Sequence, residues 1–175
     1  NSAAQGTFTV VFDGNGGVVV GQKTITVKLN QQLGNLPIAK RKGYLFRGWY
    51  LERSGGQRIN AYVRPASSGS RTVYAQWDKV TKPKKAAITS LRKRGSGKFT
   101  VKYRKVSQAK GYEICYSTNK KFRSSTKKVT ASSLSKTVKG LKKKKTYYVR
   151  VRAYKADSTG SKVYGSYSKT RKIKV

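Results

Sequence analysis

Apolar and polar residues alternate along much of the chain, and no stretch repeats with the period of a helix. The clearest alternation runs over residues 147–154. One face of this stretch carries its more apolar positions, Tyr147, Val149, Val151 and Ala153. The opposite face carries Tyr148, Arg150, Arg152 and Tyr154. A period of two with β-branched and aromatic residues predicts a strand that is buried on one side.

Shorter alternating stretches predict further strands, separated by turns that are rich in Gly, Asn and Ser. In the first half these stretches are 7–12, 18–20, 24–29, 41–50 and 71–77. In the second half they are 88–91, 99–103, 112–116, 127–131, 136–141, 147–154 and 166–175. Seven short strands with turn signals between them favour a β-sandwich for the second half.

A linker is predicted at residues 78–85, which contain Pro83 and no hydrophobic period. Proline disfavours regular structure at this point and stiffens the passage. We therefore expect an all-β protein of two domains, residues 1–80 and residues 81–175.

The charge of the chain is strongly positive and unevenly distributed. Lys and Arg together number 41 against five Asp and Glu, so the formal net charge is +36. Residues 1–80 carry eleven basic and three acidic side chains, whereas residues 81–175 carry thirty basic and two acidic ones. Such an excess attracts anionic partners, which include nucleic acid, acidic polysaccharide, teichoic-acid-like wall polymers and anionic membrane surfaces. The charge alone does not choose among them.

Catalysis, metal binding and membrane insertion have little support in the residue types present. The chain has no His, which removes the commonest general base and metal ligand, and its five acidic residues are scattered. The single cysteine, Cys115, falls in a predicted strand, where a buried thiol acts as a small hydrophobic residue. No apolar run approaches the length of about 18 residues that a transmembrane helix needs. We expect no enzyme, no cofactor, no metal site and no transmembrane segment.

Clusters of basic residues are the candidates for binding an anionic partner. Lys142–Lys145 are four consecutive lysines just before the strand predicted at 147–154, and they cannot all be buried because an unpaired buried ammonium is very costly. The alternative is a turn whose charges are simply solvated. The predicted polyanion-binding residues are Lys142, Lys143, Lys144, Lys145, Lys120, Lys121, Arg123, Lys127, Lys128, Arg150 and Arg152. Binding through several of them at once would weaken steeply with salt.

Aromatic residues allow two further interpretations. Tyr148 and Tyr154 could form a stacking platform for nucleic acid beside Arg150 and Arg152. Neither half carries the signature of a nucleic-acid-binding fold, so we expect only nonspecific binding to nucleic acid. Trp49 and Trp77 could form a platform for carbohydrate, but both lie in alternating strand patterns, which favours packing in the core.

The first half resembles the internalin-type (Listeria-Bacteroides) repeat of bacterial surface proteins over about residues 7–79. Four sequence blocks carry the resemblance in the expected order: Phe12-Asp-Gly-Asn-Gly-Gly17, Leu36-Pro37, Gly43-Tyr-x-Phe-x-Gly-Trp-Tyr50 and Val73-Tyr-Ala-Gln-Trp77. The resemblance implies a β-grasp-like sheet with little helix, a topology that the strand pattern alone does not give.

The second half resembles a fibronectin type III-like domain of Gram-positive surface proteins and secreted enzymes over about residues 84–175. The blocks that carry this resemblance are Val101-Lys-Tyr103, Gly111-Tyr-Glu-Ile-x-Tyr-Ser117, Gly140-Leu141, Val149-Arg-Val-Arg-Ala-Tyr154 and Tyr164-Gly-Ser-Tyr-Ser168. Tyr103 stands where the family usually has Trp. The resemblance implies that Tyr147 is the corner tyrosine, whose hydroxyl bonds back to the chain upstream.

Together the two resemblances imply a non-catalytic pair of modules from a protein that is secreted or displayed on a Gram-positive cell. Fold-level analogy leaves the function of such modules open. One hypothesis is adhesion or wall association, in which Lys-rich loops bind teichoic acid or glycosaminoglycan and the chain is a monomer. The alternatives are a passive stalk that presents another domain, and nucleic-acid binding.

Overall fold

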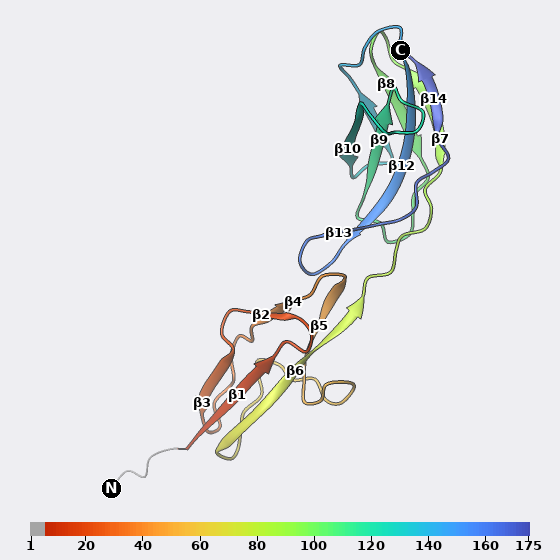
Figure 1. Ribbon diagram of the computed structural model, residues 1–175. Helices are drawn as coiled ribbons and strands as arrows, with labels where there is room; N and C mark the ends of the chain where they lie inside the picture. The colour runs from red at the N-terminus through yellow and green to blue at the C-terminus, as the bar shows by residue number, and fades with distance from the viewer. Residues whose placement is uncertain (1–5) are drawn as a thin grey trace. The chain divides into compact units, whose positions relative to one another are not determined.

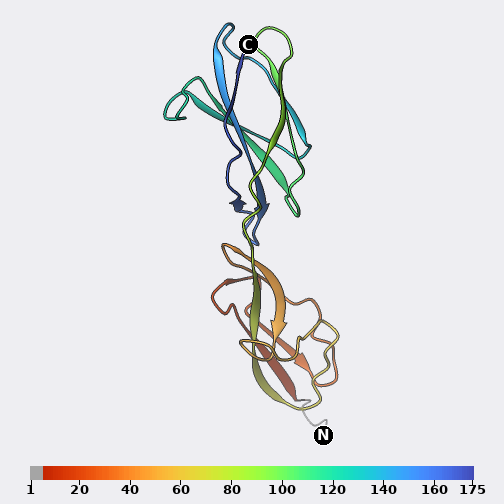
Figure 2. The same ribbon diagram turned by 90° about the vertical axis from the view of Figure 1, so that its right-hand side faces the viewer.

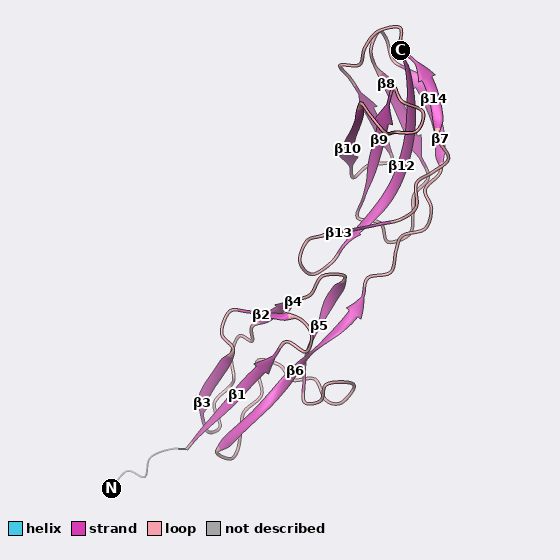
Figure 3. Cartoon of the chain, viewed as in Figure 1, coloured by secondary structure: helices cyan, strands magenta, loops and turns pink. Residues whose placement is uncertain are grey.

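The computed structural model describes residues 6–175, so the first five residues of the predicted first domain lie outside the described part. The chain divides into two compact units. One unit comprises residues up to Val80 together with Asp157–Ser161, and the other comprises Thr81–Ala156 and Lys162–Val175. Throughout the described residues the regular structure consists of strands, without a helix (Figure 3). The predicted all-β fold class is confirmed.

The first unit is built on a mixed four-stranded sheet. In spatial order the strands are β3 (Thr24–Lys28), β1 (Thr7–Asp13), β6 (Gly69–Lys79) and β5 (Tyr44–Tyr50). The first and last strands of the unit, β1 and β6, pair in parallel at the centre of the sheet, while β3 and β5 pair antiparallel at its edges. The red-orange β1 and the yellow-green β6 lie side by side in Figures 1 and 2. This parallel central pair gives the unit its β-grasp-like arrangement.

A second small sheet joins β2 (Val18–Val20) to β4 (Ile38–Lys40), and together the two sheets enclose the core of the unit. Trp49 is only 2% exposed and donates its indole Nε1–H to the Pro37 carbonyl at 2.7 Å. Its ring meets Phe12 edge-on, with 4.8 Å between centroids. A buried indole therefore has both apolar neighbours and a hydrogen-bond acceptor, as it needs.

The predicted turn after β1 brings the chain against Trp77. Asn15 and Gly16 have φ values of 45° and 94°, which favour Asn and Gly. Trp77 Nε1–H points at the carbonyls of Gly14 and Asn15, 3.1 and 3.2 Å away. A Cβ on Gly17 would lie 2.2 Å from the Trp77 ring, so only glycine fits there. Both tryptophans thus pack into or against the core, which agrees with the interpretation favoured from the sequence.

The second unit is a sandwich of two antiparallel sheets. One sheet contains β11 (Ser135–Val138), β8 (Phe99–Tyr103) and β7 (Ile88–Lys93) in that order. The other contains β10 (Thr126–Ala131), β9 (Gly111–Ser117) and β12 (Thr146–Ala156), with β13 (Lys162–Tyr164) and β14 (Arg171–Lys174) both paired to β12. The blue β12 runs the length of the unit in both Figures 1 and 2. The predicted sandwich is confirmed.

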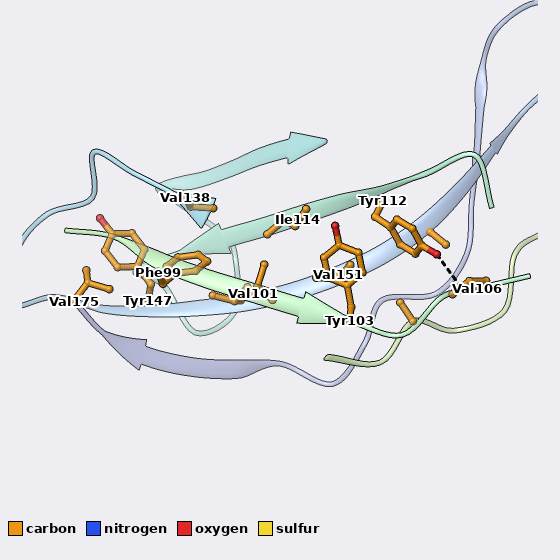
Figure 4. Close-up of a cluster of buried hydrophobic side chains, with 13 residues drawn as sticks. Phe99, Val101, Tyr103, Val106, Tyr112, Ile114, Val138, Tyr147, Val151 and Val175 are labelled. Carbon is orange, nitrogen blue, oxygen red and sulfur yellow. Dashed lines mark hydrogen bonds between the residues drawn. The ribbon is translucent and has the colours of Figure 1, made fainter. Parts of the chain in front are cut away.

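Side chains from both sheets fill the space between them. Phe99, Val101 and Tyr103 of β8 face Ile114 of β9 and Val151 of β12, as Figure 4 shows. The Tyr112 hydroxyl accepts a hydrogen bond from the Val106 N–H at 2.8 Å. Tyr103, which stands where a Trp was expected from the resemblance, is 3% exposed and donates its hydroxyl to the Ser133 carbonyl at 2.7 Å. A tyrosine therefore fills this core position with its polar atom satisfied.

Two short strands were not predicted from the sequence, and the range predicted for the last strand is too long. β4 and β13 have three residues each, which is too short for an alternation to be recognised. The stretch predicted as one strand over 166–175 contains only β14, because Tyr167 and Ser168 belong to the loop before it. The alternation over 147–154 is correct, and the strand extends from Thr146 to Ala156.

Candidate polyanion-binding surface

The acidic side chains of the chain are all engaged, which leaves the lysines uncompensated. Four carboxylates pair with arginine: Asp78 with Arg47, Asp13 with Arg53, Glu52 with Arg71 and Glu113 with Arg152. The fifth, Asp157, accepts hydrogen bonds from the backbone N–H groups of Thr159 and Ser161. Within residues 6–175, no lysine forms an ion pair with a carboxylate side chain.

The four consecutive lysines form an exposed turn between β11 and β12, here called the lysine turn (Lys142–Lys145). All four side chains are exposed, yet the backbone is held at several points. The Lys142 N–H donates to the Tyr147 hydroxyl at 2.9 Å, the Lys144 N–H donates to the Val175 carbonyl, and the Lys145 carbonyl accepts from the Val175 N–H at 3.1 Å. The bond to Tyr147 is the one implied for a corner tyrosine. The turn therefore presents exposed charged side chains on a hydrogen-bonded backbone.

A pocket of about 280 Å³ lies beside the lysine turn and is here called the lysine pocket. Three lysines line it: Lys142 from the turn, Lys127 from β10 and Lys139 from the segment before the turn. Lys127 is the cross-strand partner of Tyr116, which also lines the pocket together with Tyr147. The remaining lining residues are Thr118, Ser125, Gly140 and Leu141. Three ammonium groups beside hydroxyls and tyrosine rings can bind the anionic groups of a polymer.

A second pocket, of about 500 Å³, contains Lys120 rather than the lysine turn. It is lined by Lys120 and Thr170 and by Tyr148, Arg171 and Lys172, of which Tyr148 and Lys172 are partners in the β12–β14 pairing. Lys121, Arg123 and Lys128 are exposed but line neither pocket. The predicted basic residues between 120 and 128 are thus divided between two pockets and the open surface.

Arg150 and Arg152 have other partners than the predicted polyanion. The guanidinium of Arg150 lies between the rings of Phe122 and Tyr167, 4.1 and 4.0 Å from their centroids. That of Arg152 lies 3.6 Å from the Tyr164 centroid and 4.5 Å from that of Tyr167. These five side chains form a stack on the outer face of the sheet, here called the aromatic–arginine ladder. Both arginines face away from the core, as the alternation predicts, but the ladder covers them.

The ladder ends on a buried carboxylate. Arg152 donates to both oxygens of Glu113, through Nε at 2.9 Å and Nη2 at 3.3 Å, and Tyr167 donates its hydroxyl to Oε1 at 2.7 Å. Burial alone raises the pKa of Glu113, but the hydrogen bonds from Tyr167 and Arg152 outweigh it and hold the pKa below its ordinary value. Burial and the bond to Glu113 raise the pKa of Tyr167. The charge of Arg152 is thereby neutralised within the protein.

Arg150 is less completely satisfied. In the described part of the chain, its Nε is the one buried side-chain polar atom without a hydrogen-bond partner. The two aromatic faces beside the guanidinium provide the attraction that stands in for that bond.

Sequence reasoning named Lys127 and Lys142 separately, and the structure brings them into one pocket. Lys139, Arg171 and Lys172, which line the two pockets, were not predicted from the sequence. A signal for Lys139 was present, since it stands three residues before the lysine turn. The signal for Arg171 and Lys172 was their place in a charged closing strand.

The described residues also bear on metal binding and on membrane insertion. No group of three or more His, Cys, Asp or Glu is placed to hold a metal ion in this part of the chain. No helix there is long and apolar enough to cross a membrane. Cys115 is a buried free thiol on the outer face of β9, opposite Arg150.

Solved structures similar to this chain include several fibronectin type III domains. The sixth such domain of human fibronectin type III domain containing protein 3 has 18% identity and a TM-score of 0.43, over 56% of this chain and 90% of that one. The FN5 domain of Drosophila Lar has 22% identity and a TM-score of 0.43, over 53% of this chain and 96% of that one. No curated protein sequence matches the chain. Residues 8–76, in the first unit, match the family model of the Listeria-Bacteroides repeat domain.

Proposed function

We propose that this chain is a non-catalytic pair of modules from a bacterial protein that is secreted or displayed on the cell surface, and that its second unit binds anionic wall or host polymers. The match of residues 8–76 to a bacterial repeat domain supports a surface or structural module. The internalin-type character, the Gram-positive origin and the domain boundary near residue 80 belong to the same proposal.

The observation that carries polymer binding is the combination of the lysine turn with the lysine pocket. Six lysines line the lysine pocket or form the lysine turn beside it: Lys127, Lys139 and Lys142–Lys145. None of them forms an ion pair with a described carboxylate. Because the backbone of the turn is already fixed, binding would order the side chains and not the loop, which reduces the entropic cost of association.

The chemistry of the site favours an extended anion over a small neutral ligand. Lysine ammonium groups are strongly hydrated point charges on flexible stems, and they follow a row of phosphates or sulfates without fixing its geometry. Teichoic acid and sulfated glycosaminoglycan both present such rows. We narrow the proposed contacts to Lys120, Lys121, Arg123, Lys127, Lys128, Lys139 and Lys142–Lys145, and assign Arg150 and Arg152 to the aromatic–arginine ladder.

The test is binding of the full chain to wall teichoic acid, a heparin-like polysaccharide and single-stranded DNA of matched charge across a salt series. The test variant replaces Lys142–Lys145 with Ser. The control variant replaces Lys85, Lys102, Lys105 and Lys110 with Ser, because these exposed lysines lie elsewhere on the same unit and carry the same total charge.

We expect the test variant to bind one of the glycans or wall polymers more weakly than the control does, with a log–log salt slope shallower by about 3. Equal loss of binding in both variants would contradict a specific site. Equal binding of all three polymers, lost at the same salt concentration, would instead favour a passive stalk whose charge is unspecific.

A further inference from the structure

Three arginines of the first unit surround a pocket of about 560 Å³ that the proposed function leaves unused; it is here called the arginine pocket. Arg41, Arg47 and Arg53 line it together with the rings of Tyr44 and Trp77. Its size lies in the range of small-molecule sites. The turn Asp13–Gly17 lies at its margin, since Asn15 and Gly16 also line it.

Arg41 is the guanidinium of this pocket that has no carboxylate partner among the described residues. Arg47 pairs with Asp78 and Arg53 with Asp13, whereas Arg41 appears in none of the ion pairs of residues 6–175. Its guanidinium carbon lies 3.9 Å from the centroid of the Tyr44 ring. It also approaches Gly16, where a Cβ would lie 3.2 Å from the same carbon. Arg41 is therefore held in place while its hydrogen-bonding edge stays available to a ligand.

The amide side chains of the pocket add acceptors beside this donor. Asn15 Nδ2 donates to the carbonyls of Arg53 and Ala75, both at 2.9 Å. Gln76 Nε2 donates to the carbonyls of Glu52 and Gly55, at 3.0 and 2.6 Å. Both NH₂ groups are already used within the protein, and Asn15 Oδ1 also accepts a long hydrogen bond from Arg53 Nη1 at 3.5 Å. An amide oxygen has two lone pairs, so Asn15 Oδ1 keeps one for a ligand beside the carbonyl oxygen of Gln76. These oxygens accept hydrogen bonds from hydroxyls and repel an anion.

We propose that the arginine pocket binds an acidic sugar, a monosaccharide unit that carries a carboxylate. The planar guanidinium of Arg41 matches a carboxylate through two parallel hydrogen bonds. The Asn15 and Gln76 oxygens accept from the ring hydroxyls, and the aromatic side chains Tyr44 and Trp77 offer apolar surface to the sugar ring. A bare phosphate satisfies the arginine and leaves the acceptors unmatched, so the combination selects a ligand with both groups.

The two tryptophans give a direct readout in the intact chain. Trp77 lines the pocket, whereas Trp49 is buried in the core and is absent from the lining. The chain has two indole N–H groups, so a ¹H–¹⁵N spectrum resolves one signal from each, assigned by the loss of one in Trp77→Phe. We expect glucuronic acid to move the Trp77 signal in a saturable way and to leave the Trp49 signal in place. Glucose, acetate and inorganic phosphate should each move it less.

The variant Arg41→Gln should weaken glucuronic acid at least about tenfold, as loss of a charge-assisted hydrogen bond does. The matched control is Arg64→Gln, because Arg64 is exposed in the same unit, outside the lining, and donates to the Asn30 carbonyl. An unchanged Trp49 signal in both variants reports an intact fold.

An unmoved Trp77 signal would overturn the proposal, as would an equal response to glucose or to inorganic phosphate, or equal binding by Arg41→Gln and the control. The inference does not rest on polymer binding by the second unit. Replacement of Lys142–Lys145 with Ser should leave the Trp77 response unchanged, so the two proposals fail separately.

Discussion

Arg152 and Glu113 are direct partners in the β9–β12 register, and their side chains close a two-point ion pair with distances of 2.9 and 3.3 Å. The pair lies on the face of the sheet that points away from the core, where an alternating strand would present charge to solvent. Tyr167, from the loop before β14, covers it and donates to the same carboxylate. The loop between β13 and β14 thereby attaches to the outside of the sandwich, and this contact gives the first prediction.

Replacement of Glu113 with Gln should destabilise the chain by about 2–3 kcal/mol, because removal of one partner leaves a half-buried guanidinium without its counter-charge. Urea unfolding at neutral pH measures this loss. The control is Glu52→Gln. The ion pair of Glu52 with Arg71 is exposed, with 3.6 Å between its nitrogen and oxygen, so this substitution should lower the free energy of unfolding by less than about 1 kcal/mol. Equal effects of the two substitutions would contradict the structural role of Glu113.

The Glu113 carboxylate should also make the stability of the folded chain depend on pH in the acidic range. The pKa of Glu113 is lowered in the folded chain, so its contribution to stability is full above the pKa of an unfolded Glu and is lost as the pH falls through the folded pKa. The wild-type chain should therefore lose stability on acidification faster than Glu113→Gln does. Chemical unfolding from pH 6 down to about pH 3, across the unfolded value of about 4.3, measures the difference. Parallel curves would contradict the prediction.

Phe122 should hold the β9–β10 loop to the sheet through Arg150. The substitution Phe122→Ala removes one of the two rings that flank this guanidinium, and we expect a loss of about 1–2 kcal/mol. Hydrogen exchange should rise in residues 118–125 and remain unchanged in β8. Substitution of the neighbouring exposed Arg123 with Ala serves as the control, and a loss of similar size there would rule out a specific contact by Phe122.

Tyr147→Phe should destabilise the second unit by about 1–2 kcal/mol and loosen the lysine turn, because the Lys142 N–H loses its acceptor. Thermal or urea unfolding gives the first effect, and faster exchange of the Lys142 amide gives the second. Tyr148→Phe, on the opposite face of β12, removes a hydroxyl from a half-buried ring and should change neither. Protection of the Lys142 amide in Tyr147→Phe equal to that of the wild type would refute the anchoring role.

The buried hydroxyl of Tyr103 should make the stability of the folded chain depend on pH in the alkaline range. Burial raises the pKa of Tyr103 to about 12, whereas an unfolded tyrosine has a pKa of about 10. Its contribution to stability is therefore complete below the unfolded value and is lost as the pH rises from about 10 to about 12. Tyr103→Phe should be less stable at neutral pH, since the Ser133 carbonyl loses its donor, but should decline less between these pH values. An identical decline would show that Tyr103 does not titrate in this range.

Strand identity could be predicted from the sequence wherever one face of a strand meets a core. The alternation of residues 147–154 is repeated in the burial of Tyr147, Val149, Val151 and Ala153. Residues that share a strand share this constraint, so a short window of sequence contains it. The three-residue strands are too short for a clear alternation, and a local pattern identified only β2. β2 and β4 depend on each other across the chain, whereas β13 pairs with the end of β12 just before it.

The candidate sites depended more on the tertiary structure. Lys127 and Lys142 line one pocket because β10 and the lysine turn meet at one end of the sandwich, which no spacing in the sequence encodes. Arg41, Arg47 and Arg53 meet for a similar reason in the first unit.

By itself the sequence determined an all-β chain with a polycationic second half and too few acidic groups to neutralise it, because periodicity and charge are properties of composition and local order. Only the tertiary structure decided which charges remain available. Arg150 and Arg152 are covered by aromatic rings that come from two separate loops and from β13, whereas Lys142–Lys145 stay exposed on a turn held by Tyr147 and Val175. The physical reason is that a basic side chain can be neutralised or covered by groups far away in sequence, and folding alone brings those groups together.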